Sequence, residues 1–67
     1  MFTIEELGKK KNRGDWKLVS ERVGITRHHA SHAFKHPSSI HHIAVVRALR
    51  EIVEQREKDL REALGNE

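Results

Sequence analysis

Side chains that suit recognition of a polyanion are concentrated between residues 26 and 36. Arg27 carries a planar guanidinium that can donate to guanine O6 and N7 together, and His28 and His32 add imidazole groups one helical turn apart. If the apolar residues of this segment turn inward on a helix, Arg27, His28 and His32 point outward. The major groove of B-form DNA accepts a helix with such a face. Arg27, His28 and His32 are therefore predicted to read DNA bases.

A second set of side chains suits contacts to phosphates, which position a protein on DNA without reading its sequence. Hydroxyl, imidazole and ammonium groups surround the same helix, whose first amides add an anion site, and a lysine-rich run precedes it. Alone, that run is as typical of a solvated loop as of a DNA contact. The predicted phosphate contacts are Thr26, His29, Ser31, Lys35, Lys17, Lys9, Lys10, Lys11 and Arg13.

Three histidines also follow a metal-ligand spacing. His28, His32 and His36 lie at i, i+4 and i+8, which places their imidazoles along one stripe of a helix. Three ligands spread over two turns cannot close a tetrahedron without another element, and no carboxylate lies nearby in sequence to orient them. No metal and no other cofactor is therefore predicted.

The composition argues against catalysis. There is no cysteine and no tyrosine, no glycine-rich phosphate loop, and no nucleophile beside a base in a recognisable setting. A chain of this length in helices rarely encloses a pocket. The sequence predicts a protein that is not an enzyme and has no small-molecule substrate.

Length and charge indicate one small domain over residues 1–67. Of its 67 residues, 36% are hydrophobic, and no run approaches the ~20 apolar residues of a membrane helix. Residues 1–37 carry eight Lys and Arg against four acids, whereas residues 38–67 carry five against six. A basic half beside a balanced half suggests that one part meets a polyanion and the other serves assembly. We expect a cytoplasmic protein, associated with the nucleoid and not with a membrane.

The local pattern predicts an all-α fold, a small four-helix domain with a long C-terminal helix. Thr3 and Glu6 form a capping box that opens a short helix, which Gly8 can end. Asp15 is the predicted N-cap of a second helix over about 16–23, with Trp16 as a core anchor.

The later helices have equally local signals. Thr26 can cap a third helix that runs through His36 and ends at Pro37. Ser38 and Ser39 can cap a fourth over residues 40–64. Four i,i+4 ion pairs are predicted along it: Arg47 with Glu51, Arg50 with Glu54, Glu54 with Lys58, and Glu57 with Arg61.

Residues 16–36 have the spacing of two helices that cross closely through a tight turn. Ser20, Ala30 and Ala33 are small where the helices must touch, and Gly24 supplies the positive φ of the turn, after which Ile25 turns inward. The alternative is an ordinary helical bundle in which Gly24 is only a C-cap.

Leu18 to Phe34 resembles the helix-turn-helix of lac-repressor-type and phage-repressor-type regulators. The Gly24-Ile25-Thr26 turn followed by Ala30-Ser31 is the specific part of the match. Ser20 replaces the usual alanine of that pattern, and Ala30 and Ala33 replace its usual branched residues. The resemblance implies sequence-specific binding of double-stranded DNA by a bacterial or phage-type transcriptional regulator, a repressor, and it places the base-reading positions on Arg27, His28 and His32.

The fourth helix raises the question of assembly. Its apolar positions from Val46 to Ala63 follow an a/d seam that one chain cannot cover alone, so we expect the part from about Val53 onward to meet a second copy in a homodimer. The predicted dimer interface comprises Val53, Arg56, Leu60, Ala63 and Leu64. The alternatives are a monomer with a frayed helix end and, as a different function, an adaptor that binds polymerase or another regulator through this helix.

Overall fold

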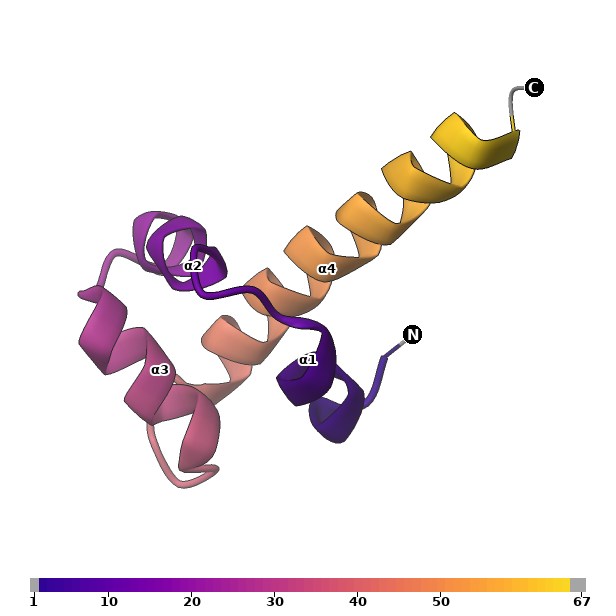
Figure 1. The fold of residues 1–67 in the computed structure, drawn as a ribbon. Helices are drawn as coiled ribbons and strands as arrows, with labels where there is room; N and C mark the ends of the chain where they lie inside the picture. The colour runs from indigo at the N-terminus through magenta and orange to yellow at the C-terminus, as the bar shows by residue number, and fades with distance from the viewer. Residues whose placement is uncertain (1, 66–67) are drawn as a thin grey trace.

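The computed structural model describes residues 2–65, which form four helices and no strand. The helices are α1 (Ile4–Lys10), α2 (Asp15–Val23), α3 (Arg27–Lys35) and α4 (His42–Gly65), as Figure 1 shows. The predicted all-α, four-helix class with a long last helix is confirmed. Within the described residues, no helix combines the length and the apolar character that a membrane crossing would need.

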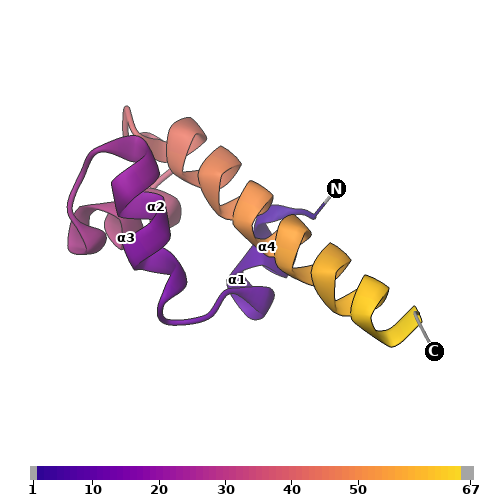
Figure 2. The ribbon, with the colours of Figure 1, turned by 90° about the horizontal axis from the view of Figure 1, so that it is seen from above.

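The long helix α4 is the spine of the molecule. The other three helices pack against its first half, while its last turns project beyond them, so the molecule measures 44 × 21 × 16 Å (Figure 2). Every helix contributes to a single core, whose buried apolar residues are Leu7, Val19, Ala30, Ala33, Phe34, Val45, Val46, Ala48, Leu49, Ile52 and Val53. Because the chain has no disulfide, this core and the polar contacts around it hold the fold.

The start of α1 follows the sequence prediction, but its end does not. The Glu6 amide donates to Thr3 Oγ1 at 3.2 Å and the Thr3 amide donates to Glu6 Oε1 at 3.1 Å, which completes the capping box and lowers the pKa of Glu6. The helix then continues through Gly8 to Lys10. Gly8 faces the core instead of ending the helix, since a Cβ there would lie 4.0 Å from Phe34 Cε2.

Asp15 is not the N-cap of α2, as the sequence predicted, but its first residue. Its buried carboxylate accepts from the Asn12 amide at 2.7 Å and from Arg56 Nη1 at 2.8 and 3.0 Å. Arg56 also donates from Nη2 to the Lys10 carbonyl at 2.8 Å. The pair therefore ties the linker between α1 and α2 to α4, and no local pattern specifies it because Arg56 lies 41 residues away along the chain.

The predicted ion pairs within α4 are not the ones that form in the described part of the chain. Its charged residues instead bridge to other helices, in the pairs Lys10–Glu57, Arg22–Glu51 and Asp15–Arg56, and Arg50 donates to the Phe2 carbonyl. Charged side chains on α1 and α2 lie close enough to these residues of α4 to pair with them in place of the residues one turn away on α4. The hydrogen bond from Lys10 lowers the pKa of Glu57.

The start of α4 also differs from the prediction, by two residues. The helix begins at His42, and Ser39 Oγ accepts from the His41 amide at 3.2 Å ahead of it. Ile40, which was expected to open the helix, lies exposed in the turn before it.

The Asp15–Arg56 pair predicts a measurable contribution to stability. Asp15→Ala removes a carboxylate that accepts from both Arg56 and a backbone amide, so the free energy of unfolding should fall by about 2 kcal/mol. Glu51→Ala is the matched control, because the exposed Arg22–Glu51 pair should contribute less than about 0.5 kcal/mol. Urea denaturation followed by circular dichroism measures both, and equal losses would contradict the special role of Asp15.

Candidate nucleic-acid interface

The turn between α2 and α3 has the geometry that the sequence predicted. Gly24 adopts φ +83°, the left-handed region, and its amide donates to the Ser20 carbonyl at 2.8 Å. The Ile25 amide donates to the same carbonyl at 3.1 Å, and the Ile25 side chain packs against the core. These contacts fix the direction in which α3 leaves the turn.

The inward face of α3 fixes its rotation about its own axis. Ala30, Ala33 and Phe34 are buried, and Phe34 packs on the partly buried Trp16 ring with centroids 5.6 Å apart. Thr26 caps the helix as predicted, its Oγ1 accepting from the His29 amide at 3.1 Å.

His42 secures the other end of α3, a role that the sequence did not reveal. Its buried ring donates from Nδ1 to the Ala33 carbonyl at 2.9 Å, because a carbonyl oxygen can only accept. This carbonyl lies in the last turn of α3, where it also accepts from the His36 amide at 3.3 Å. The first residue of α4 therefore helps to hold α3 in place.

The outward face of α3 carries the residues predicted to contact DNA. The predicted base readers Arg27, His28 and His32 are all exposed. Of the phosphate set on the same helix and its cap, Thr26, His29 and Lys35 are exposed and Ser31 is half-buried. The fold thus brings together one continuous surface of hydrogen-bond donors and titratable rings over residues 26–35.

The stretch of sequence that contains this face has a charge pattern that the single motifs did not reveal. Between Glu21 and Glu51 the sequence has no acidic residue, yet the same stretch holds all six histidines. It also contains five basic residues, Arg22, Arg27, Lys35, Arg47 and Arg50. A search for the longest acid-free stretch would have marked the segment that contains the turn, α3 and the start of α4 as suited to a polyanion.

The lysine-rich run lies apart from α3 and is only partly a loop. Lys9 and Lys10 belong to the last turn of α1, which packs on α4, and Figures 1 and 2 both place α1 away from α3. Lys10 Nζ lies 2.9 Å from Glu57 Oε1, and Lys11 Nζ donates to the Gly8 carbonyl at 3.2 Å. Lys10 and Lys11 therefore already have partners within the chain, whereas Lys9, Arg13 and Lys17 are exposed.

No match came from comparisons of this chain with protein-family models, with curated proteins or with solved structures. The functional proposal below therefore depends on the geometry of α3 and the charges around it.

Two pairs of imidazole rings lie on or beside the outward face. His32 and His36 stack with centroids 4.1 Å apart, and His29 meets His41 edge to face at 5.4 Å. Positive charge on His36, followed by partial desolvation and the charges of His28, His29 and Lys35, lowers the pKa of His32. Within residues 2–65, no three histidine, aspartate or glutamate side chains are grouped as a metal site requires.

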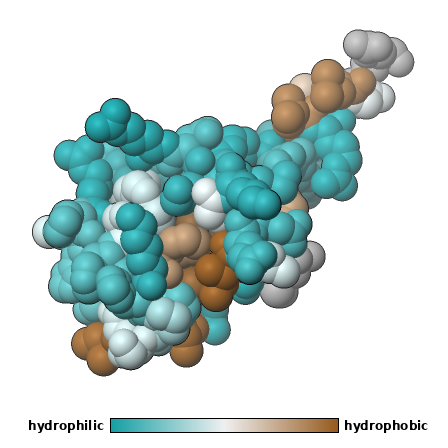
Figure 3. All heavy atoms as spheres, turned by 60° about the horizontal axis from the view of Figure 1, so that its bottom comes forward, coloured by the Kyte–Doolittle hydropathy of each residue, from teal (hydrophilic) through white to brown (hydrophobic). Residues whose placement is uncertain are grey.

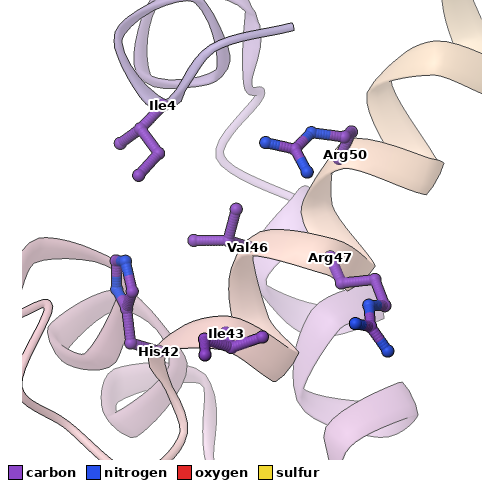
Figure 4. A pocket seen from close by; sticks show the side chains of 6 residues that line it. All are labelled: Ile4, His42, Ile43, Val46, Arg47 and Arg50. Carbon is purple, nitrogen blue, oxygen red and sulfur yellow. The ribbon is translucent and has the colours of Figure 1, made fainter. Parts of the chain in front are cut away.

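A shallow hollow of about 230 Å³ lies between α1 and α4 (Figure 4). Ile4, Ile43 and Val46 give it apolar walls, and His42, Arg47 and Arg50 complete its lining. Figure 4 shows the Arg50 guanidinium turned over the hollow and Arg47 turned away from it. No residue of α3 lines this hollow, and His42, which does, connects it to the Ala33 carbonyl at the inner side of α3.

The residues predicted for a dimer interface divide into two groups. Val53 has no exposed surface, so the structure corrects the prediction that it faces a second chain. Arg56 binds Asp15, and its side chain remains 35% exposed. Packing against α1 and α2 extends one turn further along α4 than expected. Leu60, Ala63 and Leu64 lie beyond that packing and are exposed.

The stacked pair of His32 on α3 and His36 just after it predicts a lowered pKa for His32. In the free protein, the pKa of His32 should lie below its ordinary value of 6.5, and His36→Gln should raise it by removing the closest positive charge. A titration of the histidine ring protons by NMR measures both values. His41→Gln is the matched control, since it removes a ring that meets His29 edge to face and should leave the pKa of His32 nearly unchanged.

Proposed function

We propose that this protein binds double-stranded DNA by laying the outward face of α3 in the major groove. The observation that carries the proposal is the complete division of α3, whose apolar residues Ala30, Ala33 and Phe34 are buried while Arg27, His28 and His32 are exposed. The stretch of sequence that contains this face has no acidic residue between Glu21 and Glu51, which supports the same partner.

In this proposal Arg27 is the principal base reader. It is the first residue of α3, and the N-terminal residues of a recognition helix are those that reach base edges. Its fork can donate to guanine O6 and N7 together. His28 and His32 read adjacent base edges, while Thr26, His29, Ser31 and Lys35 contact phosphates and hold the register.

The biological role proposed with this binding is transcriptional regulation. The α2–α3 sequence resembles lac-repressor-type and phage-repressor-type regulators, which supports a repressor that occupies an operator sequence near a promoter. Lys17, Lys9 and Arg13 supply further phosphate contacts in this proposal, since their side chains are exposed.

Two substitutions separate base reading from phosphate contact. Arg27→Ala should cost about 1–3 kcal/mol on the preferred site and relax preference at one base pair. Lys35→Ala should weaken binding to all duplexes alike and reduce the slope of log K against log salt by about 1. Selection of bound fragments from random duplexes identifies the preferred site, and fluorescence anisotropy on it measures the affinities.

Lys58→Ala is the matched control, because it removes the same charge from an exposed position on the projecting part of α4. Its affinity should stay close to that of the parent protein. Equal losses from Arg27→Ala, Lys35→Ala and Lys58→Ala would mean that only net charge is sensed, which would overturn sequence reading. The adaptor function, which uses an apolar helix face, would give a complex with little dependence on salt.

The histidines of the candidate interface on α3 predict that the affinity for DNA depends on pH. Phosphates favour the charged form of His32, so DNA binding should raise its pKa from the depressed value of the free protein and the complex should take up a proton. Because the bound-state pKa is the higher one, affinity should be greatest at low pH and decline between about pH 6 and 8. Anisotropy at constant ionic strength measures the profile, and it should flatten in His32→Gln. A flat profile for the parent protein would rule out this coupling.

A further inference from the structure

The apolar stripe that forms the core of α4 continues onto its projecting end. Leu49 and Val53 are fully buried, and Leu60 and Leu64 extend the same spacing of four and seven residues. Their side chains are 56% and 67% exposed. Figure 3 shows apolar surface on this end of α4, next to the grey terminal residues. A stripe that buries the helix against α1 and α2 thus reaches solvent where those helices end.

A hollow between α2 and α4 adjoins the exposed stripe. It encloses about 320 Å³, and its apolar walls are Leu18, which is 45% exposed, and Ile52. Charged and polar groups surround these walls, namely Asp15, Arg22, Gln55, Arg56 and Asp59. Arg56 and Asp59 lie within about one turn of Leu60, so the hollow and the exposed stripe occupy successive parts of α4 along its axis, on neighbouring sides of the helix.

The stripe and the hollow cannot meet within one chain. Ile52 and Leu64 belong to the same continuous helix and are about 18 Å apart along its axis. The projecting end therefore cannot fold back over the hollow without breaking α4. A second copy of the chain can bring its own helix end to this position.

We propose that the projecting end of α4 and the hollow beside Leu18 form one self-complementary surface that binds the same surface of a second copy. The two helix ends run antiparallel and cross at Leu60. Ala63 and Leu64 of each copy then lie opposite the turn around Arg56 of the other, beside its hollow. Such a contact is isologous, so the two-fold axis closes the assembly at a dimer.

Charges along the stripe favour this antiparallel arrangement. Glu57, whose carboxylate also accepts from Lys10 of its own chain, and Arg61 lie one turn apart on the same flank of the stripe. In an antiparallel pair each flank meets the same flank of the other helix in reverse, so Glu57 of one copy comes beside Arg61 of the other. The complementary charges select a second copy of this chain over an unrelated apolar partner.

The small size of this surface predicts a weak dimer. Stable interfaces bury about 1,200 Å² or more, and two helix ends with two shallow hollows offer less. A dissociation constant on the order of 10⁻⁴ M is therefore expected. If α3 binds DNA as proposed, the dimer presents two copies of it to one duplex and favours a palindromic site.

Sedimentation equilibrium of the full chain without DNA, from about 10 µM to about 1 mM, tests the dimer. The parent protein should show a monomer–dimer equilibrium. The double variant Leu60→Gln/Leu64→Gln and the single variant Leu18→Gln should each raise the dissociation constant at least about tenfold, because both remove apolar contact. Glutamine is a good helix former, so thermal melts by circular dichroism should stay close to those of the parent protein.

Ile43→Gln is the matched control, since it makes the same change at a residue of α4 that is 71% exposed and lies outside the proposed surface. Its dissociation constant should equal that of the parent protein. A monomer at 1 mM would overturn the proposal, as would a dimer that is unaffected by the Leu60 and Leu64 changes or by Leu18→Gln. Because no DNA is present, these outcomes are independent of whether α3 binds DNA.

Discussion

Burial of Ala30, Ala33 and Phe34 is the constraint on which the rest of the molecule depends. These side chains fix the rotation of α3 about its axis, and the rotation decides which residues face water. Small side chains at two of the three positions let α3 lie close to α2 and α4, and the left-handed Gly24 sets its direction. The exposed row that begins at Arg27 is thus a consequence of core packing.

One apolar stripe of α4 runs through both its packed first half and its projecting end. Its first half is buried by the other helices, and its charged residues bind α1 and α2 through Glu57, Glu51 and Arg56. These ion pairs between helices form where α1 or α2 lies close to α4, because a partner on another helix can approach the charged group from the outer side of α4. Beyond Glu57 no helix of the described chain covers α4, and the same stripe becomes a surface for contact.

A small chain without disulfides needs specific polar contacts as well as apolar burial. The buried carboxylate of Asp15 in α2 accepts from Arg56 in α4, and the buried ring of His42 in α4 donates to a carbonyl of α3. No buried side-chain polar atom within the described residues lacks a partner. Both contacts lie at helix ends, where the regular hydrogen bonding of the helix stops. They connect the linker between α1 and α2, and the end of α3, to α4.

The sequence by itself determined the features that depend on residues a few positions apart. The Thr3 and Thr26 caps, the Gly24 turn and the inward face of α3 were all predictable, since each involves hydrogen bonds or side-chain periodicity within one or two turns. The exposed row at Arg27, His28 and His32 followed from that periodicity. Only the tertiary structure decided that Asp15 pairs with Arg56, that Val53 belongs to the core and that α1 continues past Gly8. Those outcomes depend on which distant segments meet in space, because a buried carboxylate, an apolar side chain or a glycine can satisfy several local patterns until a neighbouring helix selects one.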